Sequence, residues 1–482
     1  MATPRKLDFN EKPYIVIWET TQACDLACVH CRACAQPQRN PFELSTAEAR
    51  GLIDQIAEMK VPVFVLTGGD PLKRPDIHDL VQYAHQRGVH TSMTPSATPL
   101  LTKDAIARLK QDGLARLAVS LDGSTADIHD AFRRVPGSYR CTLDAIRWAR
   151  ELGLPVQVNT TITRRNLDDF DSMVRLLETL DIVLWSVFFL VPTGRGQTAD
   201  LVTAEEFEMM FEKLYQTSAQ VRFDIKTTEA QHYRRFLLQR RVEERRQGGA
   251  SLRTSVVVAD AFTAALGGDG IARAPRGLND GKGFVFISHV GEVFPSGFLP
   301  LAAGNVRTQR LADIYRDSPL FRALRDTSQL KGKCGVCVFK EICGGSRARA
   351  YALTGDATAE EPCCVYQPGR DAVVAQFEIH RGSAGTVSSV SCGHGREANQ
   401  ERQGPTAGRS TRQEGPSSSP EDEEGAPRGL QAGRCADREA GHRGALGSLE
   451  ASDSNCTTTR NAQKAEPALA GWSECQSAGA TL

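Results

Sequence analysis

The sequence predicts an α/β fold in which a parallel β-sheet, covered by helices, curves into a full or partial barrel. Six short apolar runs alternate with helix-like segments between Tyr14 and about Leu190, as expected for consecutive β-then-α units. Parallel neighbours need crossovers on the outside of the sheet, and six such units in succession favour curvature into a barrel.

The six strands are expected at residues 14–19, 63–67, 89–94, 114–122, 155–163 and 183–192. Between them, one helix begins at a capping box of Ser45 and Glu48, and another, "PDIHDLVQYAHQRG", ends at a glycine. Residues 200 to about 250 are predicted to be helical, with a charged and solvated face. Residues 281–298 have the pattern of a hairpin that turns at Gly291.

The composition changes sharply beyond roughly Arg381. This segment has no Ile, Phe or Tyr, so it cannot bury enough apolar surface to offset the entropy lost on ordering. We therefore expect a disordered tail over 381–482. No function is assigned to its cysteines, which are Cys392, Cys435, Cys456 and Cys475.

Length and charge set limits on the organisation and the partners. A chain of 482 residues exceeds what one core usually fills, so a large domain and at least one smaller unit are expected. Lys+Arg and Asp+Glu balance at 58 each, so we expect neither a nucleic acid nor a membrane as partner.

No signal-peptide core or apolar stretch of roughly 18 residues is present, and a cytoplasmic protein is predicted. In a reducing compartment, 14 cysteines favour metal binding over disulfides.

Four of these cysteines, Cys24, Cys28, Cys31 and Cys34, lie within eleven residues just past the first strand. Four thiolates would close a metal cluster and make an electron carrier, whereas three would leave one metal site open for chemistry. The spacing C-x3-C-x2-C-x2-C differs from the C-x2-C-x2-C-x3-C of bacterial ferredoxins. Zinc is a further alternative.

Three glycine-containing or polar segments follow successive strands and outline one nucleotide-like pocket beside the cysteines. "LTGGDPL" supplies Gly68, Gly69, Asp70 and Pro71, in which the glycines permit close ligand approach and the acid can meet an ammonium group. "SLDG" supplies Ser120 and Asp122, which can hold hydroxyl groups. "VPTGRG", at 191–196, is another glycine-opened loop.

Together these motifs resemble the radical S-adenosylmethionine superfamily across roughly residues 14–200. The resemblance implies a partial (β/α)6 TIM-like barrel and a 4Fe–4S cluster held by Cys24, Cys28 and Cys31, with S-adenosylmethionine on the fourth iron. His30 matches the aromatic-like position before the third cysteine, and Cys34 falls outside the motif as a small buried thiol.

The same resemblance implies which residues contact S-adenosylmethionine. Gly68, Gly69 and Asp70, followed by Pro71, match the Gly-Gly-Glu element with a shorter acid. Ser120, Asp122 and Arg133 match positions expected to hold the ribose and the methionine carboxylate, and Asn159 lies at the matching fifth-strand position. An electron donor such as flavodoxin or ferredoxin is implied as a partner, and no catalytic residue is assigned.

A second cysteine group has C-x2-C-x5-C spacing at Cys334, Cys337 and Cys343, followed by the pair Cys363 and Cys364. Residues 281–368 resemble the SPASM and twitch extensions of the superfamily. Because Ser296 and Ser346 stand where a full extension would place further cysteines, the resemblance implies one auxiliary 4Fe–4S cluster rather than two. Its fourth ligand is expected to be Cys364, from the likeness of "EPCCVYQP" to the D-P-x-C-x-Y-x-P ending of the subgroup.

Within the superfamily the chain is most similar to the haem-biosynthesis branch. The resemblance implies hydrogen abstraction from a tetrapyrrole propionate with loss of its carboxylate. His232 is a candidate to approach an iron or a propionate, and Arg234 or Arg235 to pair with carboxylates. Two alternatives stay open: maturation of a ribosomally made peptide, and a non-enzymatic iron–sulfur electron carrier.

The predicted organisation is a barrel core at 1–200, a helical connection at 201–280, an auxiliary-cluster domain at 281–370 and the tail.

Overall fold

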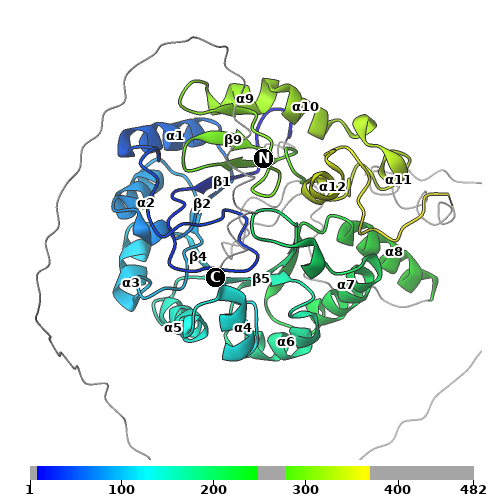
Figure 1. Cartoon of the computed structure of the whole chain (residues 1–482), viewed down its shortest axis with the longest axis horizontal. Helices are drawn as coiled ribbons and strands as arrows, with labels where there is room; N and C mark the ends of the chain where they lie inside the picture. Colours follow the sequence, from blue (N-terminus) through cyan, green and yellow to red (C-terminus); the bar gives the residue numbers. More distant parts are fainter. Residues whose placement is uncertain (1–7, 248–276, 370–482) are drawn as a thin grey trace, which may run out of the picture. The chain divides into compact units, whose positions relative to one another are not determined.

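The computed structural model describes residues 8–247 and 277–369, whose strands form one ten-stranded sheet encircled by helices (Figure 1). The strand order is β10-β9-β8-β1-β2-β3-β4-β5-β6-β7. Strands β1 to β7 pair in parallel with their neighbours, β8 is parallel to β1, and the pairs β8–β9 and β9–β10 are antiparallel. The sheet is open, with β10 and β7 at its edges.

The strands are β1 (Ile15–Glu19), β2 (Val63–Thr67), β3 (Thr91–Met93), β4 (Arg116–Ser120), β5 (Val156–Ile162), β6 (Leu184–Phe189), β7 (Asp224–Thr228), β8 (Phe284–Ile287), β9 (Glu292–Phe294) and β10 (Gly304–Asn305). The α-helices are α1 (Thr46–Glu58), α2 (Ile77–Gln86), α3 (Lys103–Gln111), α4 (Ala126–Arg133), α5 (Ser138–Glu151), α6 (Phe170–Thr179), α7 (Ala204–Ser218), α8 (Tyr233–Arg246), α9 (Leu311–Asp317), α10 (Pro319–Arg325), α11 (Gly332–Gly335) and α12 (Arg347–Thr354). Short 3-10 turns lie at Pro71–Lys73, Leu167–Asp169, Thr198–Asp200 and Thr327–Gln329.

The α/β class and the first six strands are confirmed. The capping box of Ser45 and Glu48 begins α1, and Gly88, at φ +72°, follows the end of α2. The hairpin of β8 and β9 turns at Gly291, which has a φ of +86°.

Two features of the sheet were not predicted. β7 interrupts the segment expected to be wholly helical and adds a seventh parallel strand. In addition, β8 pairs with β1, so the hairpin of residues 281–298 extends the sheet of the barrel core. The domain boundaries stay a prediction, and the tail at 381–482 lies outside the described residues.

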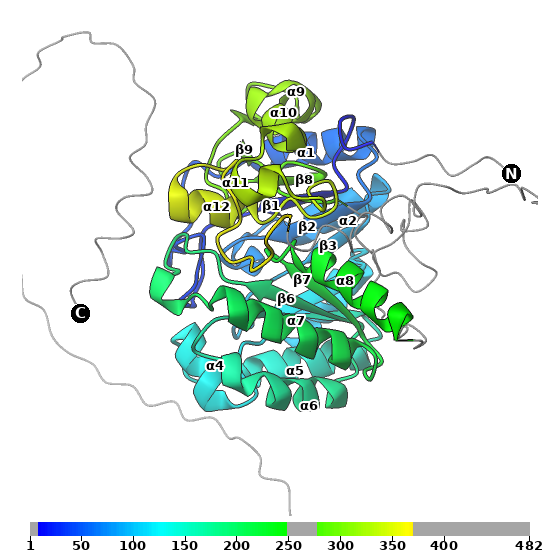
Figure 2. The same cartoon turned by 90° about the vertical axis from the view of Figure 1, so that its right-hand side faces the viewer.

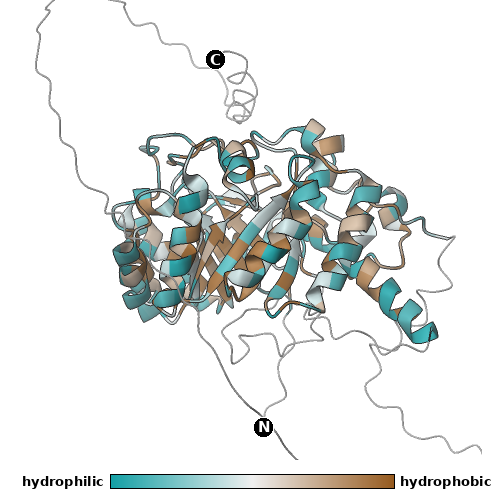
Figure 3. Ribbon diagram, turned by 90° about the horizontal axis from the view of Figure 1, so that it is seen from below, coloured by the Kyte–Doolittle hydropathy of each residue, from teal (hydrophilic) through white to brown (hydrophobic). Residues whose placement is uncertain are grey.

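The core lies between the sheet and its helices. On β1, Val16 and Trp18 are fully buried in this core, whereas Ile15 and Ile17, which alternate with them, are half-buried, because successive side chains of a strand point to opposite faces. The strands β3, β4 and β6 are buried at nearly every position. Figure 3 shows hydrophobic residues concentrated on the central strands. Figure 2 shows α9 and α10 beside β8 and β9 on one side of the molecule, and α4 to α6 on the opposite side. Within the described ranges, no helix is long and apolar enough to cross a bilayer.

Candidate functional site

A cavity of about 190 Å³ lies at the carboxyl ends of the parallel strands, where barrels of this type build their sites. It brings together residues from the loops after β1 and β2, from β4 and β5, and from α4. The predicted site residues that line it are Cys24, Cys28, Cys31, Gly68, Gly69, Ser120, Arg133 and Asn159. Asp70, Pro71 and Asp122 are not among its lining residues.

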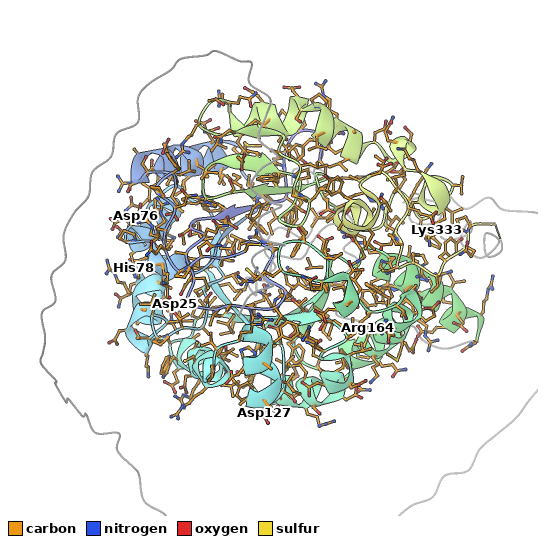
Figure 4. The ribbon with its side chains drawn as sticks, viewed as in Figure 1. Asp25, Asp76, His78, Asp127, Arg164 and Lys333 are labelled. Carbon is orange, nitrogen blue, oxygen red and sulfur yellow. The ribbon has the colours of Figure 1, made fainter. Side chains whose placement is uncertain are left out.

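The cysteine loop presents its three thiols to this cavity. Cys24 and Cys28 are buried and Cys31 is half-buried. Cys24 Sγ lies 3.2 Å from Ser96 Oγ and accepts the backbone N–H of Leu26 at 3.3 Å. Burial raises the pKa of the Cys24 thiol to about 11, so metal binding would have to displace its proton. Asp25, labelled in Figure 4, forms an ion pair with Lys73 beside this loop.

Arg133 is a buried cation at the cavity wall. Its Nη1 donates to Cys28 Sγ at 3.4 Å, and its Nη2 pairs with the Asp122 carboxylate. Burial raises the pKa of Asp122, but the charge of Arg133 and several smaller interactions together hold this pKa below its usual value. Asp122 therefore positions Arg133, which in turn can meet an anionic group in the cavity.

Gly68 and Gly69 allow the loop after β2 to pack on the chain just before Cys24. A Cβ on Gly68 would lie 2.5 Å from the Thr21 carbonyl oxygen, and one on Gly69 would lie 2.3 Å from that of Ala23. The Gly69 N–H donates to Thr21 O at 2.8 Å. These glycines therefore fix the cysteine loop as well as lining the cavity.

The Asp70 carboxylate points away from the cavity. It is fully buried and accepts hydrogen bonds from Thr98 Oγ1 at 3.0 Å and from the N–H groups of Leu72 and Ser96 at 3.2 and 3.4 Å. Burial raises its pKa to about 6. Its visible role is to hold the loop after β3, and Pro71 begins the following 3-10 turn.

The loop after β6 also forms hydrogen bonds with the cysteine loop. Arg195 donates from its backbone N–H to Cys31 O and from Nε to Cys28 O, each at 2.9 Å. Gly194 makes this approach possible, because it has a φ of +60° and a Cβ there would lie 2.4 Å from Cys31 O. The sequence predicts this glycine loop but not its contact with the cysteine loop.

Cys34 stands apart from the other three cysteines. It is half-buried rather than buried as expected, it has a φ of +46°, and it does not line the cavity.

Sequence reasoning missed a charged cluster at the cavity mouth. Arg32, which lines the cavity, pairs with Glu19 at 3.0 Å and lies over the Phe286 ring at 4.2 Å. His289 completes the cluster, with Nδ1 2.7 Å from Glu19. It comes from the loop between β8 and β9, 270 residues away, so only the pairing of β8 with β1 reveals it.

The second cysteine group surrounds a separate pocket between α8 and α11. Cys334, Cys337, Cys343 and Cys364 all line it, whereas Cys363 does not and packs into the main core. The backbone N–H groups of Glu361, Phe339 and Gly345 donate to the sulfurs of the first three at 3.3 to 3.4 Å. Lys333, labelled in Figure 4, also lines the pocket and donates to Cys364 O at 2.6 Å.

The residues proposed to contact iron or carboxylates cluster near this second pocket rather than the first. His232 and Arg235 line it. Arg234 donates to Ile342 O at 3.0 Å, and Arg235 pairs with Glu208. His232 is fully buried, and burial lowers its pKa to about 3. Among the residues that the structure describes, neither of its ring nitrogens has a hydrogen-bond partner.

Ser296 and Ser346, which stand at expected cysteine positions, belong to a buried carboxyl cluster. Ser346 Oγ donates to Glu229 at 2.5 Å, and Asp280 accepts the N–H groups of Arg347 and Ala348, each at 3.0 Å. Burial and the neighbouring Asp280 raise the pKa of Glu229 well above its usual value, so the pair holds a proton.

Both cysteine groups suit clusters better than single ions. Within residues 8–247 and 277–369, no three His, Cys, Asp or Glu side chains converge closely enough to hold one metal ion. In a 4Fe–4S cluster each thiolate binds a different iron, so the sulfurs need not converge. Three thiols around an open cavity, beside a buried arginine, fit a cluster with one iron left for a ligand.

Comparison with known proteins agrees with this site. A family model described as the radical SAM superfamily matches residues 18–177. The AdoMet-dependent heme synthase of Methanosarcina barkeri is 39% identical over 358 residues, which is 74% of this chain and 98% of that protein. The PqqA peptide cyclase of Rhodopseudomonas palustris is 30% identical over 378 residues, which is 77% of this chain and 92% of that protein.

Among solved structures, Streptococcus suis SuiB bound to precursor peptide SuiA matches with a TM-score of 0.55 at 15% identity, over 74% of this chain and 76% of that one. This likeness shows a shared fold. The chain therefore belongs to the radical S-adenosylmethionine superfamily of enzymes and, within it, to the family of the AdoMet-dependent heme synthases.

Proposed function

We propose that this radical S-adenosylmethionine enzyme converts propionate side chains of an iron-bound tetrapyrrole into vinyl groups. The observation that carries the proposal is the 39% identity to a heme synthase over nearly its whole length, joined to a cavity lined by three thiols at the strand ends. Each conversion removes one hydrogen atom, one carbon dioxide and one electron from the substrate.

Cys24, Cys28 and Cys31 would hold the 4Fe–4S cluster, and the cavity beside them would hold S-adenosylmethionine. When bound, the two groups together supply a 5′-deoxyadenosyl radical. Arg133, positioned by Asp122, would meet the carboxylate of the ligand. Ser120 and Asn159 would meet its polar groups, and Gly68 and Gly69 would admit it close to the backbone.

Cys334, Cys337, Cys343 and Cys364 would hold one auxiliary 4Fe–4S cluster. Four lining thiols and the three N–H donors to sulfur support full ligation by the protein. Arg235 and Lys333 in the same pocket would offset the negative charge of the thiolates. We also propose a cytoplasmic location, because reducing conditions there keep cysteine thiols free. Reduction of the cluster would require an electron donor such as flavodoxin or ferredoxin.

The comparisons bear differently on the two alternative functions, electron transfer and peptide maturation. An electron carrier without enzymatic activity is wrong, because the chain belongs to a family of enzymes. Peptide maturation rests on relatives of lower identity.

The test is direct. Anaerobically reconstituted protein, reductant and S-adenosylmethionine should convert iron coproporphyrin III to decarboxylated products, with 5′-deoxyadenosine formed in proportion. Formation of 5′-deoxyadenosine with no change in the mass of the tetrapyrrole would contradict the proposed substrate.

A further inference from the structure

The inner face of the curved sheet is not fully packed. On β1, β2 and β8 the residues that face the helices are buried, whereas the inward-facing Ile17, Val65 and Phe284 remain partly exposed. Barrels of this type normally fill their interior with layers of side chains. The partly exposed apolar residues therefore mark an interior with room for a ligand.

Lys226 of β7 faces this interior. It pairs in register with Ser186 of β6, which pairs with Asn159 of β5, which pairs with Ser120 of β4. Side chains at one register point to the same face of a sheet, and both Ser120 and Asn159 line the cavity. Lys226 is only partly exposed, and within the described part of the chain its Nζ has no hydrogen bond or ion pair.

Arg116 is a second inward-facing cation. It lies four residues before Ser120 on β4, so both side chains point to the same face. Arg116 is 5% exposed, and its Nε and Nη1 have no hydrogen-bond partner within residues 8–247 and 277–369. Two more polar atoms, Ser92 Oγ on the adjoining strand β3 and His90 Nε2 just before it, are also buried without partners in the described part of the chain.

One acidic side chain, that of Asp224, lies on the same inward face of β7, two residues before Lys226. It can balance only one of the two positive charges. Burial, reinforced by the charge of Arg116, lowers the pKa of Lys226 to about 8. Burial also lowers the pKa of Arg116, and no carboxylate contributes to either shift. Burying an unpaired charge is costly. The positive charge that is left in excess faces a partly open interior, which indicates a ligand that brings its own negative charge.

We propose that Lys226 and Arg116 form a subsite for the carboxylate side chains of an amphipathic substrate whose flat hydrocarbon part contacts the apolar residues of β1, β2 and β8. This inference rests on the proposed function, and it assigns to named residues the recognition of a polycarboxylate macrocycle. It separates recognition of the carboxylates from the thiols and Arg133 at the strand ends.

The test uses the reconstituted holoenzyme with iron coproporphyrin III as the probe, and its affinity is measured by absorbance titration. Lys226→Met and Arg116→Met should each weaken binding at least about tenfold, as expected for loss of a charged hydrogen bond. Each should also raise the thermal midpoint of the substrate-free protein, because an unpaired buried charge is removed. A merely structural lysine or arginine would lower that midpoint.

Two controls define the effect. Lys213→Met removes a surface lysine of α7 that pairs with Asp171 at 2.7 Å, and it should leave the affinity unchanged. Lys226→Arg keeps the charge and should restore binding. The tetramethyl ester of the same porphyrin has no carboxylates and should bind the wild type and Lys226→Met equally.

The outcomes separate the subsite from the proposed function. If the wild type binds and converts the porphyrin and both methionine variants bind it as tightly, the subsite is overturned and the function stands. If the wild type binds no iron coproporphyrin, the proposed function fails and the subsite fails with it.

Discussion

Gly194 lies directly against the backbone of Cys31, because a Cβ at this position would come within 2.4 Å of the Cys31 carbonyl oxygen. Gly194→Ala should therefore push the loop after β6 off the cysteine loop and remove the two hydrogen bonds of Arg195. We expect the variant to lose about four of about eight irons per chain after anaerobic reconstitution, the content of one cluster.

Gly51→Ala is the matched control, since a Cβ at Gly51 in α1 would meet nothing within 4 Å. That variant should bind the full complement of iron. Full iron content in Gly194→Ala as well would show that the contact does not hold the cysteine loop.

Cys363 and Cys364 are adjacent in sequence, but only Cys364 lines the second pocket. Cys364→Ala should remove the auxiliary cluster, about four irons, while Cys363→Ala should keep it. Iron content and the electron paramagnetic resonance spectrum of the reduced protein measure this difference. The assignment would be reversed if Cys363→Ala lost the iron and Cys364→Ala did not.

The buried pair of Glu229 and Asp280 should make stability depend on pH. The native pKa of Glu229 lies well above the ordinary value of 4.5, so above pH 4.5 the folded protein holds a proton that the unfolded chain releases. The free energy of unfolding should therefore fall as the pH rises from 4.5 towards the native pKa. Glu229→Gln keeps a neutral group there and should show a smaller fall.

Denaturant titrations of both proteins at several pH values above 4.5 check this prediction. Parallel curves for the wild type and Glu229→Gln would mean that Glu229 is ionised in the native state, against the arrangement described for Ser346 and Asp280.

The regular part of the fold could be predicted because its strands carry unbroken apolar runs, as in "VFVLT" at β2. β7 could not, because "DIKTT" contains only one apolar residue, Ile225. A strand with a single apolar residue has no hydrophobic pattern from which it can be predicted.

Within the site, the spacing of the cysteines predicted which of them share a cavity. It could not predict that the Asp70 carboxylate turns towards Thr98, or that His232 lies beside the second cysteine group. Those directions depend on contacts between segments far apart in the sequence, for which short motifs carry no signal.

We propose that three cysteines of the first loop, and not four, hold an open cluster. Cys31 lines the cavity, whereas Cys34, three residues later, does not. Formation of 5′-deoxyadenosine from S-adenosylmethionine by reduced, reconstituted Cys34→Ser and Cys31→Ser variants tests this most directly. We expect Cys34→Ser to keep this activity and Cys31→Ser to abolish it. Equal loss in both variants would identify Cys34 as a fourth ligand and contradict the open cluster.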